Sequence, residues 1–189
     1  MTEPRFTSSP GGIAAGIAAM VAIVALSNYA VQFPINDWLT WGALTYPIAF
    51  LVTDLTNRTL GPQAARKVIY AGFALAVVLS IWLATPRIAV ASGSAFLVAQ
   101  LLDVAVFNRL RAGAWWRAPL VSSTLGSIVD TALFFSLAFA GSGLPWMTWA
   151  LGDFGAKMAM AAIMLLPFRL LMPALRPHLA GGDLPNASR

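Results

Sequence analysis

Six stretches of this 189-residue chain are mostly apolar, and short polar segments separate them. A helix needs roughly 20 mostly apolar residues to cross the hydrocarbon core of a bilayer. We therefore predict six spans, at residues 13–32, 41–57, 68–84, 88–110, 120–140 and 146–171. The composition agrees, because 59% hydrophobic residues and a mean hydropathy of +0.75 are too apolar for a soluble domain. The predicted fold is an all-α integral membrane protein, a compact bundle of six transmembrane helices.

Basic residues gather in every second connection of this bundle. Ten of the twelve lie before the first span, after the second, after the fourth or after the sixth. The positive-inside rule then places both termini in the cytoplasm. We divide the chain into a cytoplasmic N-terminal segment (1–11), a six-helix transmembrane domain (12–173) and a disordered cytoplasmic tail (174–189). The net charge of +5 thus reflects topology, and no nucleic acid is expected as a partner.

Five ionisable residues lie inside the apolar stretches: Asp54, Asp103, Asp130, Asp153 and Lys157. Each costs at least about 2.5 to 3.5 kcal/mol in hydrocarbon, so such residues mark a polar pathway or a binding pocket. At about 1.5 Å per residue, Asp54, Asp130 and Lys157 fall near the middle of the bilayer. Gln100 falls there too, from a fourth helix. We therefore expect one polar layer inside the bundle.

Aromatic residues share helix faces with these polar side chains. Phe50 stands four residues before Asp54, a spacing that places both on one face of a helix. The same spacing joins Phe96 to Gln100, and Phe134 to Asp130. Asn28 adds a polar group to the outer half of the first span. The candidate substrate-binding residues are Asp54, Asp130, Gln100, Asp103, Asn28, Lys157, Phe50, Phe96 and Phe134.

Lys157 and the amide side chains also have structural interpretations. Asp153 and Lys157 are spaced i, i+4 and can neutralise each other on one helix. Lys157 can equally pair with Asp130 on the neighbouring span. Asn28 and Gln100 can join helices through hydrogen bonds worth only about 0.6 kcal/mol on average.

The other aspartates can be explained without a ligand as well. Asp54 lies close to Arg58, and Asp103 lies close to Arg109, so each could form an ion pair at the membrane boundary. Pro47 could break the second helix and free a carbonyl group, or it could simply kink that helix. Small residues at four-residue spacing, such as Ser122 and Gly126, predict close helix contacts.

Motifs for ATP hydrolysis and metal catalysis are missing from the sequence. It has no Gly-rich phosphate loop, no HExxH and no Cys/His cluster. It has no cysteine, and no histidine lies within a predicted span to activate a nucleophilic serine. We therefore expect no enzyme, no metal and no cofactor.

Three ordered segments resemble the signature of the bacterial queuosine precursor transporters, the YhhQ-like vitamin uptake family. The first is GALTYP (42–47) with FLVTDLTNR (50–58). The second is ASGSAFLVAQLLD (91–103) with FNRL (107–110), and the third joins SS (122–123), GS (126–127) and DT (130–131) to FF (134–135). The resemblance spans residues 25–172. It implies a six-helix importer in the bacterial inner membrane for 7-cyano-7-deazaguanine and 7-aminomethyl-7-deazaguanine, the bases from which queuosine in tRNA is made.

The polar layer suits such a cargo. A deazaguanine presents N1–H and an amine side by side, which a carboxylate can accept, and its flat ring can stack on an aromatic side chain. We expect a stand-alone secondary carrier or facilitator. Two alternatives remain, a substrate-binding membrane subunit that needs a separate energising ATPase complex, and a non-transporting scaffold protein. The driving force, the aspartate that reads the base and the formation of a homodimer stay open.

Overall fold

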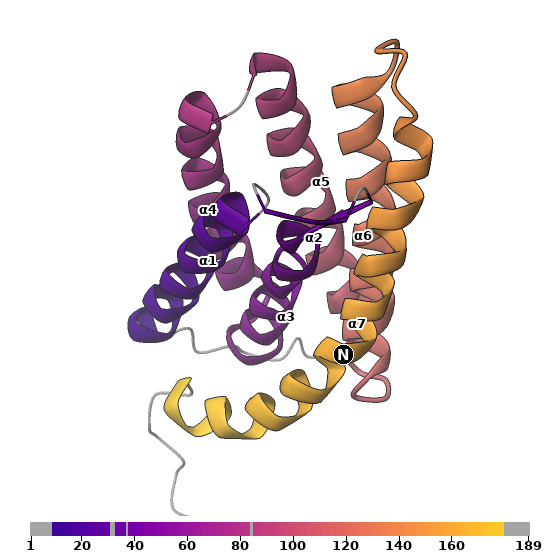
Figure 1. The fold of residues 1–189 in the computed structure, drawn as a ribbon. Helices are drawn as coiled ribbons and strands as arrows, with labels where there is room; N and C mark the ends of the chain where they lie inside the picture. The colour runs from indigo at the N-terminus through magenta and orange to yellow at the C-terminus, as the bar shows by residue number, and fades with distance from the viewer. Residues whose placement is uncertain (1–8, 31–32, 37, 84, 180–189) are drawn as a thin grey trace, which may run out of the picture.

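The computed structural model describes residues 9–30, 33–36, 38–83 and 85–179, and these form seven helices and one short hairpin (Figure 1). The helices are α1 (Pro10–Ala30), α2 (Trp41–Thr45), α3 (Ile48–Leu60), α4 (Pro62–Leu83), α5 (Pro86–Leu110), α6 (Arg117–Phe139) and α7 (Trp146–Leu179). Four of the described helices, α1, α5, α6 and α7, are long and apolar enough to cross a membrane. The prediction of a helical membrane protein is confirmed.

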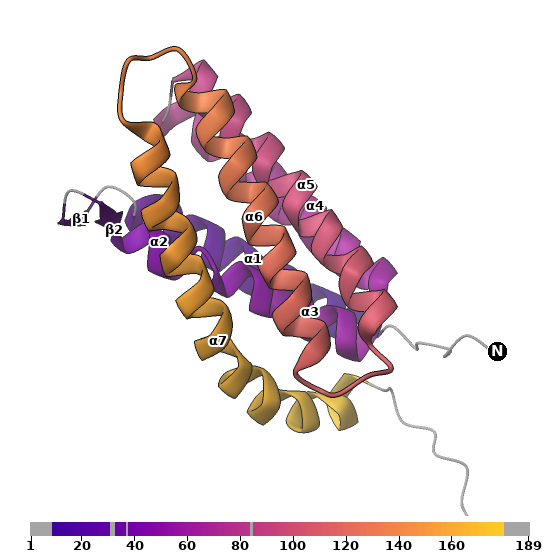
Figure 2. The same cartoon turned by 90° about the vertical axis from the view of Figure 1, so that its right-hand side faces the viewer.

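The short helix α3 lies in the middle of the bundle. Figures 1 and 2 show α1 and α4 on one side of it and α6 and α7 on the other. α3 contacts α1, α4, α5 and α7, while α5 and α6 pack along each other. A polar residue on α3 can therefore face several helices at once.

The prediction of one continuous second span is wrong, because Tyr46 and Pro47 separate α2 from α3. Proline has no N–H to donate and its ring clashes with the preceding helical turn, so the helix stops here. The chain resumes through tight backbone bonds from Ala49 N to Tyr46 O at 3.0 Å and from Phe50 N to Pro47 O at 3.1 Å. Of the two interpretations of Pro47, the break is the one observed.

Local signals fix the starts of the next two helices. Gly61 has φ 88°, a conformation that side chains disfavour, and Pro62 opens α4 directly after it. Thr85 caps α5, since its hydroxyl oxygen accepts a hydrogen bond from Ile88 N at 3.4 Å. α3 and α4, and then α4 and α5, therefore reverse direction within one or two residues.

The predicted turn after the first span contains a small hairpin. Strand β1 (Pro34–Asn36) pairs antiparallel with β2 (Leu39–Thr40). The side chain of Asn36 closes it, because its Oδ1 accepts hydrogen bonds from Trp38 N and Leu39 N, both at 2.9 Å. Gln32, the last residue of the first predicted span, and Asp37, in the connection between the first two predicted spans, lie outside the described residues.

α7 is longer than predicted and curved. It runs to Leu179, so residues 174–179 are helical although the sequence predicted a disordered tail from 174. Pro167 and Pro173 lie within it, and prolines bend a helix they do not end. Figure 2 shows its last turns crossing the end of the bundle, where Leu175 packs near Leu55 and Phe168. The predicted tail residues 180–189 and N-terminal residues 1–8 lie outside the described residues.

Candidate functional site

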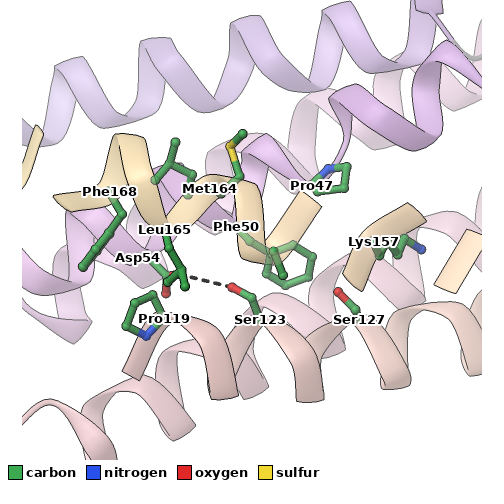
Figure 3. Close-up of a pocket in the computed structure, with 12 residues that line it drawn as sticks. Pro47, Phe50, Asp54, Pro119, Ser123, Ser127, Lys157, Met164, Leu165 and Phe168 are labelled. Atoms are coloured by element: carbon green, nitrogen blue, oxygen red, sulfur yellow. Dashed lines mark hydrogen bonds between the residues drawn. The ribbon is translucent and has the colours of Figure 1, made fainter. Parts of the chain in front are cut away.

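A pocket lies between α3, α6 and α7. Its walls are Pro47, Phe50, Leu51 and Asp54 beside or on α3, Pro119, Ser123 and Ser127 on α6, and Lys157, Ala161, Met164, Leu165 and Phe168 on α7. Figure 3 shows Asp54 near one end, Lys157 near the other and Phe50 between them. The free space is about 10 Å³, room for one water molecule. This space is too small for a flat organic molecule, so binding one requires the surrounding helices to move apart.

Hydroxyl groups hold the Asp54 end of the pocket. Asp54 is 3% exposed, and its carboxylate accepts hydrogen bonds from Ser122 Oγ at 3.4 Å and Ser123 Oγ at 3.2 Å. Neither Asp54 nor Asp103 forms an ion pair with any described residue, which removes the predicted boundary pairs with Arg58 and Arg109 from this part of the chain. Asp54 is thus an acceptor without a cation.

Asp103 and Gln100 stand behind Asp54, on α5, and do not line the pocket. Both are fully buried. The carboxyl of Asp103 neighbours that of Asp54, and neither of its oxygens has a hydrogen-bond donor among the described residues. Gln100 Oε1 accepts from Thr53 Oγ1 at 2.7 Å, while its Nε2 has no acceptor within the described chain. Gln100, which the sequence placed in one polar layer with Asp54, Asp130 and Lys157, thus bonds to α3 and does not line the pocket.

Lys157 is neutralised at the other end by two aspartates. Its Nζ lies 2.7 Å from Asp130 Oδ2 and 2.5 Å from Asp153 Oδ2, so both predicted pairings occur together. Nζ also donates to Thr131 Oγ1 at 3.1 Å, and Tyr46 OH donates to Asp130 Oδ1 at 3.3 Å. Two carboxylates and one ammonium leave this triad with one negative charge when all three groups are ionised.

Comparison with known proteins identifies the family of this chain. A family model described as "Putative vitamin uptake transporter" matches residues 40–85 and 80–172. A "Probable queuosine precursor transporter" from Haemophilus influenzae is 39% identical over 188 residues, covering 78% of this chain and 80% of that protein. A "Queuosine precursor transporter" from Escherichia coli is 36% identical over 195 residues, covering 87% and 88%. The chain belongs to this transporter family.

The membership confirms the resemblance seen in the sequence. This queuosine precursor transporter family member is a multi-pass protein of the bacterial inner membrane. A third relative, a "Probable queuosine precursor transporter" from Bacillus subtilis, is 28% identical over 130 residues and covers 54% of this chain. No solved structure matches the chain significantly.

Besides Gln100, Asp103 and Asp130, which do not line the pocket, three further predicted site residues of this family member lie away from it. Asn28 is bonded within its own helix, since its Nδ2 donates to Val24 O at 2.8 Å. Phe96 is buried in the apolar core between α1, α4 and α5. Phe134 packs edge to face with Phe135 and Phe139, at centroid distances of 5.1 and 6.0 Å. These side chains stabilise the bundle rather than line its pocket.

The sequence interpretation missed a polar clamp at the basic end of the transporter. Arg111 Nη2 donates to the carbonyl oxygen and the Oδ1 of Asn57, at 2.7 and 2.6 Å. Arg58 Nη1 donates to Arg111 O at 2.5 Å, and Asn57 Nδ2 donates to Val104 O at 3.2 Å. Burial lowers the pKa of Arg111 to about 10, and the charge of Arg58 acts in the same direction. Arg111 therefore stays charged at neutral pH and ties α3 to the end of α5.

Phe50 occupies its place because position 126 is glycine. A Cβ on Gly126 would lie 2.7 Å from Phe50 Cε1 and 3.3 Å from Ala99 O, closer than real atoms pack. The predicted close approach of helices at this position is present. Gly126 thus sets how deeply the ring of Phe50 can lie against α6.

A Gly126→Val variant is expected to push Phe50 into the pocket and to lower transport strongly, because overpacking costs about 1–3 kcal/mol. Gly155→Val on α7 is the matched control, since nothing lies within 4 Å of a Cβ there. Initial uptake rates, normalised to membrane protein, measure the difference. Equal rates in the two variants would show that the position of Phe50 is unimportant.

Proposed function

We propose that this chain imports 7-cyano-7-deazaguanine and 7-aminomethyl-7-deazaguanine as a stand-alone secondary carrier or facilitator. The relatives named as queuosine precursor transporters support the substrate class. The pocket supports the mode of recognition, because one carboxylate, one ammonium, two aromatic rings and two hydroxyl groups line it. The observation that carries the proposal is the carboxylate of Asp54 on the wall of that pocket. It is buried and forms no ion pair with a described residue.

Recognition in this proposal uses one hydrogen-bonding edge and the flat ring face of a deazaguanine. Its N1–H and amine donate to the Asp54 carboxylate, and its flat ring stacks on Phe50. Ser123 and Ser127 offer hydroxyl groups to the remaining edge of the base. Discrimination follows from pairing, because an adenine-like edge would place its N1 acceptor against an acceptor carboxylate.

The triad around Lys157 serves the substituent at position 7 of the base. With all groups ionised, Asp130 and Asp153 exceed the charge of Lys157 by one. A cationic aminomethyl arm is attracted by this excess, while a neutral cyano group can accept a hydrogen bond from the ammonium. One pocket can thereby accept both precursors.

A test in cells separates transport from the two alternatives. The host lacks the synthesis of 7-cyano-7-deazaguanine and its own importer, so queuosine in its tRNA requires uptake. Expression of this chain is expected to restore queuosine from either base supplied at low concentration. Restoration that also requires an added energising ATPase complex would identify a subunit instead. Failure with well-expressed, folded protein would favour a scaffold.

The proposed orientation places both termini in the cytoplasm. Figure 1 shows the α3–α4 turn and the α5–α6 connection at one end of the bundle, and the α6–α7 connection at the other. Arg58, Arg66 and Lys67 flank the α3–α4 turn in the sequence, and Arg109, Arg111 and Arg117 lie at or beside the α5–α6 connection. Ala112 and Ser142 are exposed, one at each end, and the chain has no cysteine. By the positive-inside rule, the end that holds Ala112 faces the cytoplasm.

An inner-membrane-impermeant maleimide is therefore expected to label Ser142→Cys in intact cells, and Ala112→Cys only after the membrane is broken. The two variants are matched, because each replaces an exposed residue in a connection between helices. Ready labelling of Ala112→Cys in intact cells would invert the proposed topology.

A further inference from the structure

Asp54 and Asp103 form a pair of buried carboxyl groups that substrate recognition does not account for. They are 3% and 0% exposed, and they neighbour each other across the contact between α3 and α5. Asp54 faces the pocket and has two serine donors. Asp103 does not line this pocket, and neither of its oxygens has a donor within the described residues.

The helices α3 and α5, which carry the pair, and the neighbouring α1 and α4 place no cation in an ion pair with either carboxyl group. On α3, Arg58 follows Asp54 by four residues, but its Nη1 donates to Arg111 O at 2.5 Å. α1 has no charged residue between 10 and 30. The basic residues of α4 and of the end of α5 are exposed, namely Arg66, Lys67 and Arg109. Neither carboxyl forms an ion pair with a described residue.

The helices on the other side of the pocket, α6 and α7, supply hydroxyl groups to Asp54 but, among their described residues, no cation. α6 presents Ser122 and Ser123 to Asp54. Lys157 on α7 shares the pocket, but its Nζ lies between Asp130 and Asp153. Of the other charged groups on α6 and α7, Arg117 is exposed, Arg169 lies 4.6 Å from the centroid of the Trp115 ring, and Arg176 and His178 belong to the last turns of α7. Tyr46, between α2 and α3, donates to Asp130.

Two carboxylates side by side in such a place cannot both keep a charge. Each would be desolvated and would repel the other, and Asp103 would also lack any donor. A shared proton removes one charge and supplies the missing hydrogen bond between the two groups. Paired aspartates that share one proton are an established solution to this problem in enzymes.

We propose that Asp54 and Asp103 together bind one proton, and that this proton crosses the membrane with the substrate. The proposal rests on the proposed import of deazaguanines. In the outward-open state the pair takes one proton from the medium. The base then donates N1–H and its amine to the Asp54 carboxylate, and the proton resides on Asp103. After opening to the cytoplasm, water hydrates both carboxyl groups, so the base and the proton both leave, and the empty carrier returns with water in place of the shared proton.

The charge balance of this cycle sets the expected size of the effect. With 7-cyano-7-deazaguanine, one neutral base and one proton move inward together, so each cycle transfers one positive charge. With the membrane potential held at zero, one pH unit, alkaline inside, supports an accumulation of at most about tenfold, since one pH unit equals about 1.4 kcal/mol. Without coupling, the internal concentration only reaches the external one.

The experiment uses the purified full chain in liposomes with potassium and valinomycin on both sides. Labelled 7-cyano-7-deazaguanine is added under three conditions: no gradient, a pH gradient that is alkaline inside, and a sodium gradient at equal pH. We expect accumulation above the external concentration only with the pH gradient, together with substrate-dependent proton entry. Accumulation with the sodium gradient instead, or none with either gradient, overturns the proton site.

Exchange of internal unlabelled base for external labelled base is measured in the same liposomes without any gradient. Exchange without pH-driven accumulation contradicts the proton site and leaves the proposed function intact. Absence of exchange contradicts the proposed function itself. The two failures are therefore distinguishable.

Asp103→Asn tests the assignment of the proton to this pair. Asparagine is a fixed neutral group of the same shape, so the variant is expected to exchange base but to lose most of the tenfold accumulation and the proton entry. Asn108→Ala, at an exposed position further along α5, is the matched control. Full pH-driven accumulation by Asp103→Asn would overturn the assignment, and the wild-type measurement stands even if this variant does not fold.

Discussion

An Asp54→Asn variant is expected to fold and insert normally but to import 7-deazaguanines at least about tenfold more slowly than the wild type. The substitution replaces one acceptor oxygen with a donor that faces N1–H or the amine of the base. The mismatch leaves buried polar groups unpaired at about 1–3 kcal/mol. Uptake of labelled base at a concentration below saturation measures the loss.

The control for this variant is Ser136→Ala on α6, because Ser136 is exposed and its hydroxyl donates only to Ala132 O of its own helix. Competition provides a second check on the wild type. An analogue without the 2-amino group is expected to compete poorly. Normal uptake by Asp54→Asn, or equal competition by adenine, would move the recognition site away from Asp54.

Lys157→Met is expected to reduce the yield of folded protein more than any other single change in the triad. The substitution removes the ammonium from between Asp130 and Asp153, whose side chains are 6% and 18% exposed. Breaking a buried ion pair by removing one partner costs about 3–5 kcal/mol, because the remaining charge has no compensation. Thermal unfolding in detergent and the fraction of monodisperse protein measure the effect.

Second substitutions should repair the loss. Lys157→Met combined with Asp130→Asn is expected to recover more folded protein than Lys157→Met combined with Asp153→Asn, since a stranded charge at the more buried Asp130 costs more. A double variant can thus be more stable than the single one. If both double variants are no better than Lys157→Met alone, the ion triad does not stabilise the fold.

The sequence predicted the Lys157 pairing because few partners exist at that depth of the membrane. Depth follows from counting residues along a helix, and charges in hydrocarbon must find each other. Asp130 and Asp153 were the aspartates within reach, and both contact Lys157. Depth and charge alone therefore led to this part of the site.

The rotation and neighbours of each helix could not be predicted in the same way. Phe96 and Gln100 share a face, but that face meets α1, α3 and α4 rather than the pocket. Ser123 was not among the predicted site residues, although its hydroxyl bonds to Asp54. Phe168 on the pocket wall carried no signal at all, because one apolar residue in an apolar span is ordinary. These features depend on which helices are adjacent, which spacing along one helix does not contain.

The break at Pro47 shows a third kind of limit. Pro47 indicates that the helix is disturbed, but a kink and a break can have the same local sequence. The break matters for the site, because Pro47 and Phe50 line the pocket where α3 begins. Packing of the neighbouring helices decides between the two outcomes.

Uptake of labelled 7-cyano-7-deazaguanine by the purified chain alone in liposomes tests the central claim most directly. We predict saturable uptake above that of empty liposomes, inhibited by unlabelled 7-aminomethyl-7-deazaguanine and reduced at least about tenfold by Asp54→Asn. Uptake equal to that of empty liposomes, from protein shown to be folded and inserted, would contradict the account.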